Sequence, residues 1–315
     1  MNRRAFLGAA GATAAAAVLP AHEARALAAQ TSPGARKGRV KLGVSSYSYW
    51  HFRPANQPYP IEKVIDHAAD LGVEGVDILH RQMTSEDNAY LQKLKKHAFV
   101  NGIDLIALSI HQGFVFPDAA ERKKNVDHTI KCMEMAYAMG IPCLRLNTGR
   151  WNTTKSFDDL MAAKGIEPNL PGYTDDQGFD WVNTSIEELL PTAEKLGVVL
   201  ALENHWGLGR TAEGVLRIVN AVNSPWLGVL ADTGNFLQDQ YAQFEALVPK
   251  TVFVQAKTYE GGGEWYALEI DYNRIAKMLE AQGYRGYVSL EFEGKAPAET
   301  AVPKAIAELR RAFGE

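Results

Sequence analysis

The sequence predicts an α/β protein, a single-domain (β/α)8 TIM barrel that occupies residues 41–315. Short β-branched or apolar runs alternate with longer helical patterns eight times after residue 41, without a break in composition. Eight strands is the number that closes such a barrel. Five helical patterns also end in a glycine directly before an apolar run, which is typical of short loops between serial helix and strand units.

The strands are expected at residues 42–47, 75–79, 105–110, 143–147, 198–203, 227–232, 252–256 and 287–291. The helices are expected at residues 61–71, 87–101, 119–139, 181–196, 211–222, 241–248, 272–282 and 298–313. The glycines that follow helices are Gly72, Gly102, Gly140, Gly197 and Gly283. An open, doubly wound sheet would share the alternation. It would carry a glycine-rich phosphate loop after the first strand, where residues 45–50 read Ser-Ser-Tyr-Ser-Tyr-Trp.

One segment interrupts the alternation. Residues 149–179 follow the fourth expected strand and are polar and rich in Gly, Pro and Asp. In a barrel of this kind the segment is a loop insertion over the C-terminal mouth of the strands. Its aromatic residues, Trp151, Phe157 and Tyr173, favour a partial lid over plain surface decoration.

The first 28 residues resemble a twin-arginine signal peptide. Arg3 and Arg4 are followed by Phe6 and Leu7, then by an Ala-rich apolar stretch, and residues 26–28 form a small-residue cleavage site. Residues 29–40 are expected to be a linker. The pattern predicts an exported, periplasmic protein, and an ordinary secretory signal or an uncleaved anchor is the alternative. The apolar stretch is too short for a stable membrane span, so none is expected after cleavage.

Composition excludes some partners. There are 33 basic and 37 acidic side chains, so there is no basic field of the kind that binds nucleic acid. The two cysteines, Cys132 and Cys143, are too few for a disulfide framework or a thiolate metal site and are interpreted as buried thiols. A homo-oligomer stays open.

Each of the last four expected strands carries one oxygen-bearing side chain at its C-terminal end: Glu203, Asp232, Gln255 and Glu291. A single acidic residue at such a place is typical of a helix N-cap or a solvated loop. Burying three unpaired carboxylates together would cost several kcal/mol each, roughly, so a repeated pattern favours one divalent cation. Carboxylate and amide oxygens without a thiolate favour Mn²⁺ or Mg²⁺ over a structural Zn²⁺.

The strand alternation places more polar groups at the same mouth. Lys257 shares a face with Gln255, and Glu293 shares one with Glu291. These two side chains are expected just above the ligands.

Residues 202–205 (Leu-Glu-Asn-His), 232–235 (Asp-Thr-Gly-Asn), 255–257 (Gln-Ala-Lys) and 290–293 (Leu-Glu-Phe-Glu) resemble the xylose-isomerase-like sugar isomerase and epimerase barrels. This family includes tagatose and psicose epimerases and hydroxypyruvate isomerases. The resemblance covers nearly the whole chain after residue 40. It implies that Glu203, Asp232, Gln255 and Glu291 hold one Mn²⁺-type ion, with Mg²⁺, Co²⁺ or Zn²⁺ as alternatives. It also implies that the two glutamates accept and donate the proton on opposite faces of a ketose.

The chain departs from the family pattern at two positions. The seventh-strand histidine is Gln255, and the histidine three residues after the aspartate is Asn235. Glutamine can coordinate through its carbonyl oxygen, which makes the expected site all-oxygen. The departures bear on the metal and on the sugar hydroxyl that Asn235 would contact, and they leave both glutamates in place.

We therefore expect metal-stabilised enediolate chemistry, in which Glu203 and Glu291 exchange a proton while Lys257 and His205 neutralise developing oxyanion charge. The candidates for substrate binding lie around the same mouth: His111, Arg145, Asn147, Asn235, Glu293, and Trp50, which could stack on a sugar ring.

The expected function is a metal-dependent isomerase or epimerase of an unphosphorylated sugar or keto-sugar. The glycines 261–263 are the one candidate phosphate cradle after strands seven and eight, and such a run is more typical of a flexible loop. Three alternatives stay open. One is a lyase on keto-glycosides that uses the same proton abstraction. The second is a non-catalytic sugar-binding protein. The third, metal-dependent phosphodiester hydrolysis as in the abasic-site endonucleases, is disfavoured because it needs a His-rich site and a basic surface.

Overall fold

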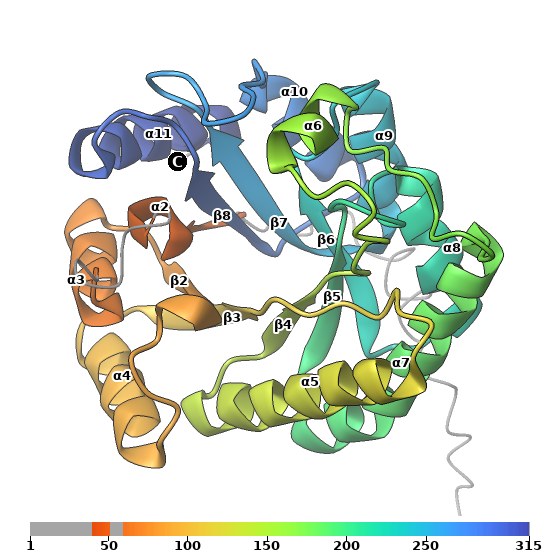
Figure 1. Ribbon diagram of the computed structural model, residues 1–315. Coiled ribbons are helices and arrows are strands. Elements are labelled where there is room, and N and C mark those ends of the chain that lie inside the picture. Colours follow the sequence, from red (N-terminus) through yellow and green to blue (C-terminus); the bar gives the residue numbers. More distant parts are fainter. Residues whose placement is uncertain (1–39, 51–58, 315) are drawn as a thin grey trace, which may run out of the picture. The chain divides into compact units, whose positions relative to one another are not determined.

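The computed structural model describes residues 40–50 and 59–314. The expected signal peptide and all but the last residue of the expected linker lie outside this part of the chain. Eight parallel strands close into a barrel in which each strand pairs with the next and β8 pairs with β1 (Figure 1). The predicted fold class is confirmed. The strands are β1 (Lys41–Ser45), β2 (Gly75–Leu79), β3 (Asp104–Ser109), β4 (Cys143–Leu146), β5 (Val199–Glu203), β6 (Leu227–Asp232), β7 (Thr251–Thr258) and β8 (Tyr287–Phe292).

The helices surround this barrel (Figure 1). The α-helices are α2 (Tyr47–Trp50), α3 (Ile61–Leu71), α4 (Asn88–Val100), α5 (Ala119–Met139), α6 (Phe157–Ala162), α7 (Asp175–Leu196), α8 (Ala212–Val222), α9 (Gln240–Leu247), α10 (Tyr272–Ala281) and α11 (Ala298–Phe313). Two short 3-10 helices are η1 (His80–Gln82) and η2 (Val248–Lys250). None of the helices in the described residues combines the length and apolar character needed to cross a bilayer.

The glycines expected to end helices all have positive φ, from 66° at Gly197 to 78° at Gly140. A side chain with a Cβ atom is disfavoured in this left-handed region, and glycine is not. At Gly140 the backbone N–H donates to the carbonyl oxygens of Ala136 and Tyr137, which closes α5. These caps let each helix return to the next strand through a short loop.

Most elements differ from their expected bounds by one or two residues, and α7 differs by six. Helix α7 begins at Asp175, six residues before the expected start at Trp181, because Thr174 and Gln177 form a reciprocal capping box. Strand β1 ends at Ser45, since Tyr47–Trp50 turns into a short helix. Because α6 and the first residues of α7 lie within it, the insertion after β4 is partly helical.

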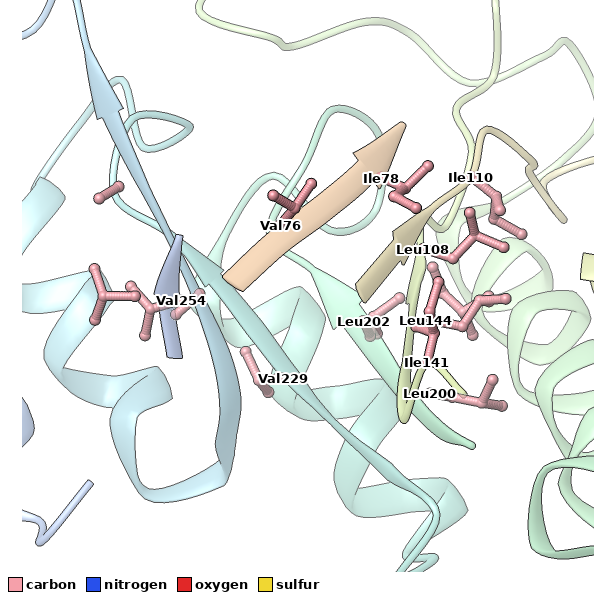
Figure 2. Close-up of a cluster of buried hydrophobic side chains, with 14 of the residues drawn as sticks. Val76, Ile78, Leu108, Ile110, Ile141, Leu144, Leu200, Leu202, Val229 and Val254 are labelled. Atoms are coloured by element: carbon pink, nitrogen blue, oxygen red, sulfur yellow. The ribbon is translucent and has the colours of Figure 1, made fainter. Parts of the chain in front are cut away.

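The core has two layers that follow the alternation of each strand. Outward-facing side chains pack against the helices, and Figure 2 shows Val76 and Ile78 of β2 and Leu200 and Leu202 of β5 among them. The smaller interior cluster fills the barrel and contains Ile106, Ala107, Cys143, Ala201, Leu230 and Phe253. Because side chains two residues apart share a face, the residues that follow this cluster along β5 to β7 point into the mouth.

Candidate active site at the barrel mouth

Four consecutive strands bring the expected oxygen ligands to the mouth. Glu203 and Asp232 are the last residues of β5 and β6, and Asp232 is in register with Gln255 of β7. Glu291 of β8 is in register with Lys257. All four expected ligands are buried, with exposed fractions between 0% and 6%. Such burial requires each carboxyl group to have a compensating partner.

The partners of Glu203 come from β4 and from the segment after β6. Arg145 Nη1 lies 3.3 Å from Glu203 Oε2, and Asn235 Nδ2 donates to Glu203 Oε1 over 3.1 Å. Arg145 also donates from Nη2 to the carbonyl oxygen of Ile110 over 2.8 Å. This second bond fixes the guanidinium beside the glutamate. Arg145 and Asn235 thus both contact Glu203.

Lys257 is the common partner of the other acidic groups. Its Nζ lies 3.6 Å from Asp232 Oδ2, 3.5 Å from Glu291 Oε2 and 3.1 Å from Glu293 Oε2. It also donates to Asn235 Oδ1 over 2.8 Å. One buried ammonium therefore lies among three carboxylates contributed by β6, β8 and the residue after β8.

Gln255 reaches across the barrel through its amide nitrogen. Nε2 donates to Asp77 Oδ2 on β2 over 3.0 Å and lies 3.4 Å from Glu291 Oε1. Asp77 also accepts a hydrogen bond from Ser109 Oγ over 2.8 Å. With the nitrogen engaged in this way, the carbonyl oxygen of Gln255 is the atom left for a further partner.

One observation supports a divalent cation bound by the four expected ligands. Three of the four expected ligands each have a buried oxygen that accepts no hydrogen bond: Glu203 Oε2, Asp232 Oδ2 and Gln255 Oε1. The first two have ion-pair contacts with Arg145 and Lys257, and Gln255 Oε1 has none. Native proteins rarely leave buried polar atoms in this state. The charge balance points the same way, since the carboxyl groups at the mouth outnumber its two cationic side chains, Arg145 and Lys257.

The ligand oxygens at the mouth do not converge on a single position. In the described part of the chain, the three carboxylates do not form a group whose ligand oxygens all lie within 4.8 Å of one another. The Lys257 ammonium is instead within 3.6 Å of both Asp232 and Glu291. A divalent ion at this mouth would therefore compete with Lys257 for the same carboxylate oxygens.

Burial dominates the protonation of this site. It raises the pKa of Glu203 and of Glu291 above the ordinary value, against the lowering effect of Arg145 on Glu203 and of Lys257 on both. Burial also raises the pKa of Asp232 to about 7. For Lys257, burial acts to lower the pKa, but Asp232, Glu293 and other neighbours outweigh it, so its pKa lies well above the ordinary value. Without another cation, Asp232 is therefore partly protonated near neutral pH while the lysine stays charged.

These pKa shifts predict that the stabilisation by a bound metal ion depends on pH. Between pH 3.8 and about 7 the folded protein binds more protons at Asp232 than the unfolded chain does, so metal-free stability falls as the pH rises through this window. A bound ion removes that loss because it takes the place of the proton. We expect saturating Mn²⁺ to raise the Tm more at about pH 8 than at about pH 5.5. Thermal unfolding with and without Mn²⁺ measures this, and an equal rise at both pH values would contradict it.

The other expected residues differ in how closely they join the site. Asn147 is buried, and its Oδ1 has no hydrogen-bond partner. His205 follows β5, is half-buried, and packs against the Trp206 ring at 5.5 Å between centroids. Burial lowers the pKa of His205 well below its ordinary value, so the ring is neutral. His111 follows β3 with an exposed side chain. Trp50 lies beside Tyr47, at 6.1 Å between ring centroids.

The site contains residues that the sequence did not single out. Tyr47 donates from its hydroxyl to Glu293 Oε1 over 3.0 Å. Tyr266 donates to Asn235 Oδ1 over 3.3 Å. Asp77 of β2 is fully buried and contacts Gln255. In the expected strand 42–47, alternation would place Tyr47 on the face of Ser45, which is the one signal that could have suggested it.

The insertion reaches the same mouth through aromatic contacts. Phe157 of α6 packs against Trp265, with ring centroids 4.5 Å apart, and against Trp206 at 6.1 Å. Trp206 in turn meets Tyr266 edge-on at 5.9 Å. The insertion thus contacts the loops that follow β5 and β7, the strands of Glu203 and Gln255. The partial lid stays a prediction.

Comparison with known proteins identifies the family. The model of the Xylose isomerase-like TIM barrel family matches residues 65–312, so the chain belongs to this family. The resemblance expected from the sequence is confirmed. No curated protein matches the chain.

Solved structures share the fold. A 3-keto-D-glucoside 4-epimerase from E. coli is 15% identical, with a TM-score of 0.67 over 87% of this chain and 100% of that one. D-Psicose 3-epimerase from Clostridium cellulolyticum H10 is 18% identical, with a TM-score of 0.62 over 87% and 97%. The protein SMc04130 from Sinorhizobium meliloti 1021 is 19% identical, with a TM-score of 0.66 over 86% and 98%. At these identities the similarity is one of fold.

Proposed function

We propose that this protein is a divalent-metal-dependent isomerase or epimerase that moves a proton on an unphosphorylated sugar or keto-sugar. The observation that carries the proposal is the pair of buried carboxyl groups on β5 and β8, Glu203 and Glu291. Burial raises the pKa of both. A raised pKa makes a carboxylate a stronger base, which proton abstraction beside a carbonyl requires.

The neighbouring residues suit this chemistry. Arg145 and Lys257 lie 3.3 Å and 3.5 Å from the two glutamates and can balance negative charge that moves onto the substrate oxygens. His205, neutral and half-buried, can donate a hydrogen bond to such an oxygen. A bound divalent ion, Mn²⁺ before Mg²⁺, Co²⁺ or Zn²⁺, would supply the positive charge that stabilises an enediolate. We assign contacts with sugar hydroxyls to Asn147, Asn235 and Glu293, with His111 and Trp50 at the rim of the site.

The loops after β7 and β8 support an unphosphorylated substrate. Close backbone packing explains Gly261 and Gly263, because a Cβ atom at Gly261 would lie 2.7 Å from the backbone nitrogen of Ala296 and one at Gly263 would lie 1.7 Å from the carbonyl oxygen of Tyr266. Gly262 has a positive φ of 84°. The carbonyl oxygen of Gly262 accepts a hydrogen bond from the Lys295 backbone, and Gly263 pairs with Gly294. The run therefore needs no phosphate to account for it.

Keto-glycosides are among the substrates that we propose to test. One structure with this fold is named a 3-keto-D-glucoside 4-epimerase. On such a substrate the same proton abstraction would also permit elimination of a β-glycosidic leaving group, which would make the protein a lyase. The proposal includes export, with residues 1–28 as the signal.

Proton exchange with solvent tests the function. The chelator-treated protein is incubated in D₂O with free ketoses and with 3-keto-glucosides, with and without added Mn²⁺. We expect deuterium to enter the substrate only after Mn²⁺ is returned, as measured by NMR, and elimination would show as release of the aglycone. Sugar binding without exchange at any metal concentration would instead identify a non-catalytic sugar-binding protein.

A further inference from the structure

A second cluster of metal-ligating side chains lies outside the mouth. His80 follows β2 at the start of η1, while His128 and Cys132 belong to α5. One ligand atom from each of the three lies within 4.8 Å of the others. His128 and Cys132 are four residues apart on one helix, a spacing that puts both side chains on the same face. Neither histidine has a role in the proposed chemistry.

We propose that His80, His128 and Cys132 form a Zn²⁺ site that links the segment after β2 to α5. Cys132, which the cysteine count alone indicates is a plain buried thiol, would then be a ligand beside two histidines. The distance between Cys132 Sγ and His128 Nε2 is 3.7 Å. Tetrahedral zinc, with Zn–S near 2.3 Å and Zn–N near 2.1 Å, separates such atoms by about 3.6 Å. The two imidazole rings are 5.4 Å apart between centroids and tilted at 51°. The separation of Cys132 Sγ and His128 Nε2 thus matches the one that a tetrahedral ion would impose, and a weak hydrogen bond to sulfur spans the same distance.

Glu86 positions one of the ligands. Its Oε1 lies 2.7 Å from His80 Nε2, and its Oε2 accepts a hydrogen bond from Lys131. A carboxylate that holds one imidazole nitrogen fixes the ring and leaves the other nitrogen, here Nδ1, for a metal. Carboxylate, histidine and metal in this order are a common arrangement around zinc. Glu86 is therefore a positioning residue and not a ligand.

The chemistry of the cluster separates it from the mouth. One sulfur and two imidazole nitrogens favour Zn²⁺, whereas the carboxylate and amide oxygens at the mouth favour Mn²⁺ or Mg²⁺. Cys132 is buried, and both histidines are half-buried, so the cluster is open to solvent on one side. Three protein ligands leave the fourth position of a tetrahedral ion to water.

Cobalt substitution tests the site directly, because Co²⁺ bound to a thiolate has a charge-transfer absorption in the near ultraviolet. Chelator-treated protein is titrated with Co²⁺, and Zn²⁺ content is measured separately by mass spectrometry of the metal. We expect one equivalent of thiolate-bound Co²⁺, displaced by Zn²⁺. Cys132→Ala should abolish the band. Cys143→Ala is the matched control, since the chain has two cysteines and Cys143 lies inside the barrel, and it should keep the band.

Two further variants make the result decisive. His80→Ala removes a ligand from a half-buried position after a strand and should also abolish the band. It serves as the test if Cys132→Ala does not fold. Glu86→Ala should weaken Zn²⁺ binding by about 10- to 100-fold. Asp232→Asn, at the mouth, should leave the band unchanged, which separates this proposal from the proposed function. The assignment would be overturned by wild-type protein that shows no thiolate band, or by a band that survives in His80→Ala.

Discussion

Glu291→Gln is expected to lower turnover and deuterium incorporation by about 10²- to 10⁴-fold, the usual contribution of a general acid or base. Glutamine has nearly the same size as glutamate but cannot accept the substrate proton. Lys257 Nζ lies 3.5 Å from Glu291 Oε2, and Gln255 Nε2 lies 3.4 Å from Glu291 Oε1. An amide at position 291 keeps one oxygen that can accept from these neighbours. Burial already raises the pKa of Glu291 well above its ordinary value, so a neutral side chain is tolerated there and the fold should survive.

The matched control is Glu74→Gln. Glu74 precedes β2, at the opposite end of the barrel, where its Oε2 accepts a hydrogen bond from the Leu42 backbone over 3.0 Å. The same chemical change there should leave proton exchange at the wild-type rate. Circular dichroism and Tm establish that both variants fold. Undiminished exchange in Glu291→Gln would remove this glutamate from the proton transfer and leave Glu203 to be tested alone.

The fold was predictable because its signals are local. The alternation of apolar runs and helical patterns, and the glycines that end the helices, depend on residues near one another in the chain. The start of α7 was missed although its capping box, Thr174 and Gln177, is also local. Gly178 weakens the helical pattern there, and the reason for it is distant, since a Cβ atom at this position would lie 3.1 Å from both Trp151 and Leu208.

The site was predictable only where strand order is enough. Glu203, Asp232, Gln255 and Glu291 end consecutive strands, so closure of the barrel brings them to one mouth. The contact of Gln255 with Asp77 joins residues 178 positions apart and depends on how side chains extend across the closed barrel. Tyr266 lies in the loop after β7, and no periodic sequence pattern predicts the path of that loop. The same holds for His80 and Cys132, which approach one another only because α5 packs beside the segment after β2.

Lys257→Met is expected to destabilise the metal-free protein by about 3–5 kcal/mol, the usual cost of removing one partner from a buried ion pair. Asp232, Glu291 and Glu293 each lie within 3.6 Å of the Lys257 ammonium and would lose their shared cation. If that ammonium competes with a divalent ion for the same oxygens, Mn²⁺ should stabilise Lys257→Met more than it stabilises the wild-type protein. Denaturant unfolding with and without Mn²⁺ measures both effects.

Lys93→Met supplies the control, because Lys93 Nζ lies 2.8 Å from Glu62 Oε1 but the lysine side chain is 68% exposed. Solvent screens such a pair, so neither stability nor the response to Mn²⁺ should change measurably. An equal response to Mn²⁺ in Lys257→Met and wild type would mean that lysine and metal do not share ligands. The lysine would then be a fixed part of the site beside the metal. A larger response would instead show that this mouth exchanges one cation for another, because the excess of carboxylates there needs positive charge from either source.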